Sequence, residues 1–326
     1  MRFSIIVCTY NRAPILELCG RSWEQLDALE HDTSELIVVD NNSSDSTQEV
    51  AASLVNRISA RPGWSSVYRF EATQGLSAAR NRGARDARGE WLVYIDDECI
   101  IPPNWLTRLD VHIRTKNPDM IGGPYKGKFL PGFEENAYPR AFQERFGDSH
   151  QRRDGWPDQW LTKPGLSGGN LAIRKETLIQ LGGFNEGLGM SGAVIGYGEE
   201  TELQVRLLRE GTRRIYYARD LELVHLVRPE KASVRAALSM ARRRAQAVAM
   251  LQSAEAQMNG EQGFIRRLRL GWVCTRRCVE LAVRLAASSA FAVVSGVPIA
   301  TVVHEEVHSG RVQAALQAAY AFGQRR

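Results

Sequence analysis

The first 125 residues alternate apolar, β-rich runs with amphipathic stretches, and this alternation constrains the fold more than any other feature of the chain. The strand-like runs cover residues 3–9, 35–40, 66–70 and 90–96. The helical stretches between them lie near residues 13–28, 45–60 and 76–88. Runs that are apolar almost throughout are typical of parallel strands covered on both faces. The repeated strand–helix–strand order therefore predicts an α/β fold with right-handed crossovers.

The pattern changes twice further along the chain. From about residue 125 to 165 it gives way to Gly, Pro, aromatic and charged residues, which indicate a functional loop or a lid. Order resumes with an apolar run at 169–174, helical stretches near 175–181 and 199–210, and a strand-like run at 215–218. After residue 228 the composition shifts to Ala, Arg and Leu, and helices are expected over 232–258, 261–295 and 309–322. We therefore expect two parts, residues 1–230 and a helical C-terminal region over residues 231–326.

The net charge of +5 comes from one region near the C-terminus. Residues 228–284 hold twelve Lys and Arg against four Glu, whereas the rest of the chain holds 30 basic and 33 acidic residues. A general nucleic-acid-binding protein more often carries its basic charge through the folded core. We therefore expect no nucleic acid among the partners, and we place any anionic partner of this basic surplus near the C-terminus.

Residues 285–303 form a run of 19 residues without a charge, close to the ~20 apolar residues that span a bilayer. The run is rich in Ala and Ser and contains Gly296 and Pro298, and six arginines precede it between Arg266 and Arg284. Such arginines are expected beside an anionic cytoplasmic leaflet. Three interpretations stay open: a buried helical hairpin, peripheral membrane contact through residues 261–303, and a membrane span, with the span favoured least.

Cysteine usage and the N-terminus bear on the compartment. The five cysteines are odd in number and show neither a metal-ligand spacing nor a disulfide framework, which favours a reducing compartment. The apolar run at the N-terminus is too short for a signal peptide. We expect a cytoplasmic protein, which could lie at the inner face of the cell membrane.

Polar residues follow the predicted strands where ligands bind in open α/β sheets, at the carboxyl ends. The first strand ends in Thr9-Tyr10-Asn11-Arg12, the second in Asp40 and the fourth in Asp96-Asp97-Glu98. Neither a G-x-G-x-x-G fingerprint nor a P-loop follows the first strand, which argues against a dinucleotide-binding enzyme and a P-loop enzyme. These side chains could instead hold a base or a ribose.

Asp96, Asp97 and Glu98 repel one another unless a cation or a basic side chain offsets their charge. Alternate residues of a strand point the same way, so Asp96 and Glu98 can share one ion. Oxygen ligands suit Mg²⁺ or Mn²⁺, which commonly bridge substrate phosphates. A solvated acidic turn is the alternative, but the trio directly follows a very apolar run.

A second acidic cluster, Glu199-Glu200-Thr201-Glu202, opens a predicted helix, where acidic residues also favour the helix dipole. At the rim of a pocket one of them could act as general base for an acceptor hydroxyl. His225 and Arg228 follow an apolar run and could add a metal ligand and a phosphate-binding charge.

Five ordered segments carry a resemblance that covers roughly residues 1–230. They are SIIVCTYNR, ELIVVDNNSSDST, GLSAARNRGARDARGEWLVYIDDE, SGGNLAIRKETLIQLGGFNE and YGEETELQVRLLREG. In this order they resemble family 2 glycosyltransferases of the GT-A fold. The resemblance implies a mixed, mainly parallel sheet flanked by helices, with residues 1–230 as the nucleotide-sugar-binding catalytic domain. It also implies an inverting transfer of a sugar from a nucleotide-sugar donor.

The resemblance assigns roles to the residues at matching positions. The base and ribose of the donor would be held by Thr9, Tyr10, Arg12 and Asp40. The donor diphosphate would lie near Arg80 and Asn81, and the ribose or donor sugar near Asp96. Asp96 and Glu98 would frame the Mn²⁺ or Mg²⁺ site, with Asp97 between them and His225 as a further ligand.

Glu200 occupies the position of the family's catalytic base and follows Glu199, where the family more usually has Asp after Glu. Its carboxylate would take the proton of the acceptor hydroxyl, while the metal and Arg80 or Arg228 would stabilise the departing diphosphate. Gly169 and Asn170 would let the backbone approach the donor sugar closely.

The leading hypothesis is a glycosyltransferase that acts in cell-surface or exopolysaccharide synthesis. Its acceptor is a glycan or a lipid-linked saccharide, and its donor is a UDP-sugar, with GDP- and dTDP-sugars left open. Two alternatives are a nucleotidyltransferase and a non-catalytic sugar-nucleotide-binding protein on the same fold.

Overall fold

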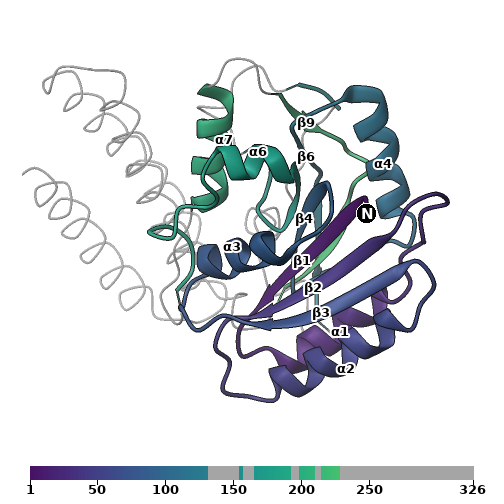
Figure 1. Ribbon diagram of the computed structural model, residues 1–326, viewed down its shortest axis with the longest axis vertical. Coiled ribbons are helices and arrows are strands. Elements are labelled where there is room, and N and C mark those ends of the chain that lie inside the picture. The colour runs from purple at the N-terminus through teal and green to yellow at the C-terminus, as the bar shows by residue number, and fades with distance from the viewer. Residues whose placement is uncertain (131–153, 157–164, 192–197, 210–213, 228–326) are drawn as a thin grey trace, which may run out of the picture. The chain divides into compact units, whose positions relative to one another are not determined.

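A seven-stranded sheet forms the centre of the computed structural model, which describes residues 1–130, 154–156, 165–191, 198–209 and 214–227 (Figure 1). The strand order is β3-β2-β1-β4-β8-β6-β9. The strands are β1 (Phe3–Thr9), β2 (Ser34–Asp40), β3 (Trp64–Phe70), β4 (Trp91–Asp96), β6 (Met120–Gly122), β8 (Asn170–Arg174) and β9 (Ile215–Tyr217). Only β8 is antiparallel to its neighbours within this sheet, so the expected mixed, mainly parallel sheet is confirmed.

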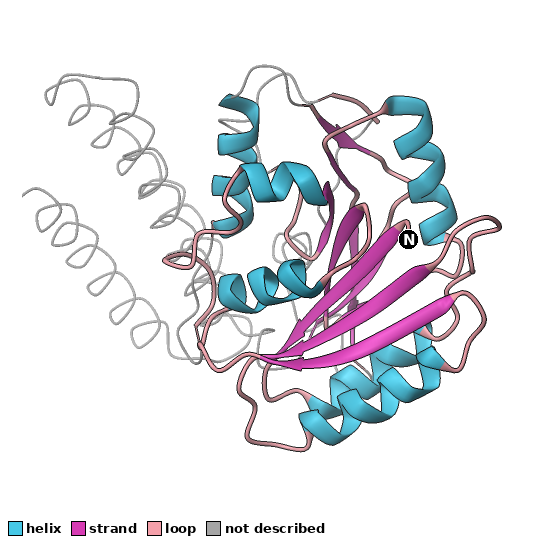
Figure 2. Cartoon of the chain, viewed as in Figure 1, coloured by secondary structure: helices cyan, strands magenta, loops and turns pink. Residues whose placement is uncertain are grey.

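Helices cover both faces of this sheet (Figure 2). They are α1 (Ala13–Trp23), α2 (Thr47–Ser59), α3 (Leu76–Asp86), α4 (Trp105–Lys116), α6 (Lys175–Gln180) and α7 (Glu199–Arg209). Val7 packs in one buried cluster with residues of α1, α2 and α4, whereas its neighbour Ile6 packs in a second cluster with residues of α3, α6 and α7. Because successive strand residues face opposite sides, both sides must be apolar, which explains the continuous apolar runs of β1, β2 and β4.

The structure differs from the sequence-based expectations in several elements. β3 lies at an edge of the sheet and most of its residues are only partly buried, so the third strand is not covered like the central ones. α1 ends at Trp23 instead of near residue 28, and shortly afterwards the backbone N–H of Asp27 donates to the carbonyl of Pro103. The stretch expected to be irregular from about residue 125 begins with a strand, β7 (Tyr125–Phe129).

A second, three-stranded sheet was not expected. It has the order β5-β10-β7, with β5 (Cys99–Ile100) antiparallel and β7 parallel to β10 (Leu223–Val227). Its register pairs His225 with Cys99, which places His225 beside the acidic residues that precede β5. This sheet therefore connects the end of β4 to a strand more than a hundred residues further along the chain.

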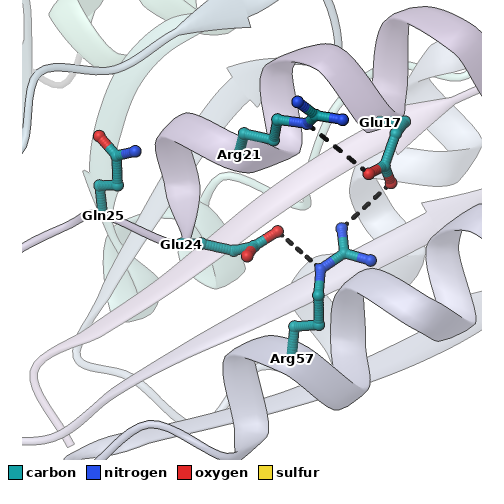
Figure 3. Close-up of a pocket in the computed structure, with 5 residues that line it drawn as sticks. All are labelled: Glu17, Arg21, Glu24, Gln25 and Arg57. Carbon is teal, nitrogen blue, oxygen red and sulfur yellow. Dashed lines mark hydrogen bonds and ion pairs between the residues drawn. The ribbon is translucent and has the colours of Figure 1, made fainter.

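An ion-pair cluster joins α1 to α2 on the molecular surface (Figure 3). Arg57 donates to Glu24 at 2.8 Å and to Glu17 at 3.1 Å, and Arg21 lies 3.9 Å from the same Glu17. With Gln25 these side chains line a pocket. Partly exposed pairs of this kind contribute about 0–1 kcal/mol each, so the docking of both helices depends mainly on their apolar faces.

The helices expected over residues 232–258, 261–295 and 309–322 lie outside the described residues, as does the uncharged run 285–303. Among the helices that are described, none is long and apolar enough to cross a membrane. The division into residues 1–230 and 231–326 stays a prediction.

The close approach of α3 to β1 at Gly83 gives a test of the packing. A Cβ at position 83 would overlap Cγ2 of Ile6, a β-branched side chain fixed on a central strand. We expect Gly83→Ala to lower the free energy of unfolding by about 1–3 kcal/mol, measured by urea denaturation.

Gly20→Ala is the matched control, because Gly20 is also a buried helical glycine. A Cβ there would meet the terminal methyl groups of Leu54 at 3.0 Å, and these can adjust. Alanine favours a helix by about 1 kcal/mol over glycine at both positions. Equal stability of the two variants would contradict the close packing of α3 on β1.

Candidate active site

The carboxyl ends of three neighbouring parallel strands bring the predicted polar residues together. Thr9 is paired in register with Asp40, and Cys8 with Asp96, so the ends of β1, β2 and β4 lie side by side. Thr9 and Asp40 are buried, whereas the side chain of Asp96 is 33% exposed. At this edge of the sheet the carboxylate of Asp96 is therefore accessible, while the polar side chains of Thr9 and Asp40 are buried.

The loops after β1 and β2 are tied to each other. Asn11 adopts a left-handed backbone with φ of +51°, its N–H donates to the hydroxyl of Ser43 at 2.8 Å, and its side-chain oxygen accepts from the N–H of Ser44 at 2.7 Å. An Asn tolerates this backbone conformation better than most residues. These contacts hold the two loops in a fixed geometry before any ligand arrives.

Asp40 lies under these loops with both carboxylate oxygens occupied. It accepts a hydrogen bond from the N–H of Ser43 at 2.9 Å and another from the hydroxyl of Tyr68 at 3.0 Å. Burial and the bond to Asp40 raise the pKa of Tyr68 to about 12, so its hydroxyl keeps the proton that it donates in the hydrogen bond to Asp40. Tyr10, which directly follows β1, is partly exposed.

Arg12 offsets the two buried acidic residues after β4. Its Nη1 lies 2.6 Å from Oδ1 of Asp97 and 3.5 Å from Oε2 of Glu98. Burial raises the pKa of Asp97, and the charge of Arg12 opposes that shift. The positive charge of Arg12 thus offsets the repulsion between the carboxylates of Asp97 and Glu98.

Glu98 also contacts His225, with Oε1 of Glu98 3.0 Å from Nε2 of His225. This is the separation of a direct hydrogen bond, and the carboxylate oxygen and imidazole nitrogen are also groups that can bind a divalent cation. Asp96, the third predicted ligand, contacts Arg80 and Tyr125. Among the described residues, no three His, Cys, Asp or Glu side chains converge on one point as a metal cluster.

Asp96 is held from two sides. Its Oδ1 lies 3.6 Å from Nη2 of Arg80, and its Oδ2 accepts from the hydroxyl of Tyr125 at 3.4 Å. The Tyr125 ring in turn lies 5.2 Å from the ring of His225, centroid to centroid. Tyr125 thus stands between Asp96 and the Glu98–His225 pair, and no sequence signal marked it in advance.

The two acidic residues at the start of α7 differ in their surroundings. Glu199 is buried and accepts from Nη1 of Arg80 at 2.8 Å. Glu200 is partly exposed, and burial together with the neighbouring charge of Glu199 raises its pKa to about 8, against the opposing effect of Arg80. Glu200 is therefore the more exposed of the two carboxyl groups, whereas Glu199 is engaged by Arg80.

The remaining predicted residues support the backbone of the site. Asn81 donates to the carbonyl of Phe184 at 2.9 Å and accepts from its N–H at 2.8 Å. The amide of Asn170 is fully buried and donates to the carbonyls of Pro124 and Leu221 at 3.0 and 2.8 Å. A Cβ on Gly169 would overlap the carboxylate of Asp96, so this glycine makes room for Asp96. Arg228 lies outside the described residues.

Solved structures share this fold. A mannosyltransferase from Pyrobaculum calidifontis, PcManGT in complex with GDP-Man and Mn²⁺, matches with a TM-score of 0.59 and 20% identity over 97% of this chain and 84% of its own. TarS from S. aureus in complex with UDP-GlcNAc matches with a TM-score of 0.52 and 19% identity over 77% of this chain and 66% of its own. At these identities the matches show the GT-A fold.

Comparisons by sequence give the family. The chain is 28% identical over 203 residues to the succinoglycan biosynthesis protein ExoM of Rhizobium meliloti, a match that covers 62% of this chain and 60% of that protein. It is also 28% identical over 203 residues to N-acetylgalactosaminyltransferase 7 of Drosophila melanogaster, covering 56% of this chain and 32% of that protein. The model of glycosyl transferase family 2 matches residues 4–182, more than half of the chain. The chain therefore belongs to glycosyl transferase family 2, as its ordered motifs indicated.

Proposed function

We propose that this chain moves a sugar with inversion from a nucleotide-sugar donor, for which a UDP-sugar is favoured, to a hydroxyl group of a glycan or a lipid-linked saccharide. The observation that carries the proposal is the pairing of one buried arginine, Arg80, with Asp96 at the end of β4 and Glu199 at the start of α7. Through this pairing Arg80 links Asp96 to the helix that begins with Glu199 and Glu200, and the side chains of Asp96 and Glu200 are partly exposed. Family membership supports the reaction class.

The donor would lie along the carboxyl edge of β1, β2 and β4. Thr9, Tyr10 and Asp40 are at the ends of β1 and β2, where base and ribose would bind, and the interlocked loops limit the entropy lost on binding. UDP-GlcNAc and GDP-Man are bound by the structural neighbours TarS and PcManGT. The donor sugar would then lie next to Asp96.

In the proposed reaction, the oxygen of the acceptor hydroxyl forms a bond to the anomeric carbon of the donor. The bond between this carbon and the oxygen of the β-phosphate breaks, and the nucleoside diphosphate leaves with the electron pair. Glu200 accepts the proton of the attacking hydroxyl, which requires its ionised form. A carboxylate whose pKa is near the working pH suits this role.

Glu98 and His225 are the described residues that would hold a divalent cation. When bound, Mn²⁺ or Mg²⁺ would supply positive charge for the departing diphosphate. PcManGT contains Mn²⁺, which supports a divalent cation without selecting between the two. Asp96 would contact the donor from the neighbouring position, and Arg12 would keep Asp97 and Glu98 in place.

The acceptor and the pathway are proposed from the relatives and from the sequence. ExoM takes part in succinoglycan biosynthesis, which supports a role in exopolysaccharide or cell-surface glycan synthesis. A lipid-linked acceptor agrees with the basic and apolar residues over 261–303, whose membrane contact stays a prediction.

Ligand binding tests the donor class first. We expect one of UDP, GDP and dTDP to raise the melting temperature in a Mn²⁺-dependent way, since a ligand at a hundred times its dissociation constant stabilises the native state by ~2.7 kcal/mol. The matching nucleotide sugar should then be consumed, with release of the diphosphate. Failure of all three to shift the melting temperature, together with no turnover of UDP-GlcNAc, UDP-Glc or GDP-Man, would overturn the proposed function.

Glu200→Gln tests the base. The amide keeps the shape of the side chain but does not accept a proton, so kcat for donor turnover should fall by about 10²–10⁴ while diphosphate affinity stays the same. Glu202→Gln is the control, because Glu202 lies in the same helical turn but pairs with Arg206 at 2.7 Å. A Glu200→Gln variant with normal kcat would show that another group takes the proton.

The dependence of kcat/KM on pH should reflect the interaction between the carboxyl groups of Glu199 and Glu200. Below a pH of about 8 Glu200 is increasingly protonated and inactive, so kcat/KM should rise with pH and level off above it. Glu199→Gln removes the adjacent negative charge, which makes ionisation of Glu200 easier and should move the rising limb to lower pH. If the rising limb of the kcat/KM profile stayed at the same pH or moved to higher pH in Glu199→Gln, the assignment of Glu200 as the base would be contradicted.

A further inference from the structure

Arg80 is a buried cation that contacts two separate parts of the proposed active site. It lies on α3 with 3% of its surface exposed. Its Nη1 donates to Oε1 of Glu199 at 2.8 Å, while Nη2 lies 3.6 Å from Oδ1 of Asp96. Glu199 is 119 residues away in the sequence. The guanidinium fork therefore spans the end of β4 and the start of α7.

The rest of the guanidinium is enclosed by the protein. Its carbon lies 5.3 Å from the centroid of the Phe184 ring, so one face is against an aromatic side chain. A Cβ on Gly168 would lie 2.8 Å from Nη2, and a Cβ on Gly169 would overlap the carboxylate of Asp96. Neither glycine has a positive φ in the left-handed range. Their lack of a side chain thus provides space for the Arg80–Asp96 contact.

Charge and burial together limit what Arg80 can do. A buried carboxylate that loses its cation is costly, and Glu199 is 5% exposed. A diphosphate drawing Arg80 away would leave Glu199 in that state. Because α7 begins at Glu199, fixing this residue also fixes its neighbour Glu200.

We propose that Arg80 is a positioning residue that fixes Glu199 relative to Asp96 and thereby places Glu200 against the anomeric carbon, instead of binding the donor diphosphate as the family resemblance implies. The inference rests on the proposed function, because it assigns Glu200 its role there. If Arg80 has this role, replacing it should lower the rate of sugar transfer and change the affinity for the donor little.

Arg80→Lys is the principal test, because lysine keeps the charge but has one nitrogen and cannot bond Glu199 and Asp96 as a fork. With the donor found in the nucleotide screen, kcat should fall at least tenfold, while donor KM and the Kd of the free nucleoside diphosphate change less than about threefold. Arg82→Lys is the matched control: Arg82 lies on the same helix and pairs with Asp86 at 3.2 Å. Its kcat should equal that of the wild type.

A second variant separates positioning from folding. Arg80→Met alone leaves Glu199 without a cation, whereas the double variant Arg80→Met/Glu199→Met replaces the buried pair by apolar side chains of similar size. We expect the double variant to have a higher melting temperature than Arg80→Met and still to lose at least tenfold in kcat.

Two outcomes would overturn the proposal while leaving the proposed function intact. One is a tenfold or larger rise in diphosphate Kd in Arg80→Lys with normal kcat, which would make Arg80 a phosphate contact. The other is wild-type kcat in both Arg80→Lys and the double variant. Absence of turnover in the wild-type protein would overturn the proposed function and this inference with it.

Discussion

The pairing of buried carboxylates with two arginines is the interaction on which the proposed site depends. Asp97 and Glu98 lie against Arg12, and Glu199 lies against Arg80, all at the carboxyl edge of the main sheet. Without these cations the acidic residues would repel one another and would lose the solvation of water without compensation. The arginines leave Asp96 and Glu200 as the partly exposed carboxylates among these residues, so charge neutralisation determines which acids can meet a ligand.

This division follows from topology. Parallel β1, β2 and β4 end at the same edge, and antiparallel β8 begins there, so Gly169 reaches Asp96 from the opposite chain direction. The second sheet adds His225 by pairing β10 with β5. The directions and pairings of the strands therefore place residues in or next to five strands around the carboxyl edge of β1, β2 and β4.

Much of the fold could be predicted from the sequence, because the evidence for it is local. Apolar runs gave β1, β2 and β4 almost to the residue, and amphipathic periods gave α2 and α3. The second sheet could not be predicted, since β5 has only two residues, β7 is short and contains Gly127, and both pair with a strand far away in the sequence. In the site, the carboxylates after β4 were found from their position, but the pairing of Arg12 with Asp97 and the difference between Glu199 and Glu200 depend on contacts between distant parts of the chain.

The sequence separation of Arg80 and Glu199 has a consequence for the growing polypeptide. A ribosome completes β1 to β4, with the acidic residues 96–98, about a hundred residues before it adds Glu199, and His225 comes later still. The chain leaves the ribosome N-terminus first, so until Glu199 is added Arg80 has no access to its main counter-ion. The proposed catalytic base is delivered by the same segment that supplies this counter-ion. Translation therefore supplies the residues proposed to hold the nucleotide before it supplies the residues proposed to carry out the chemistry.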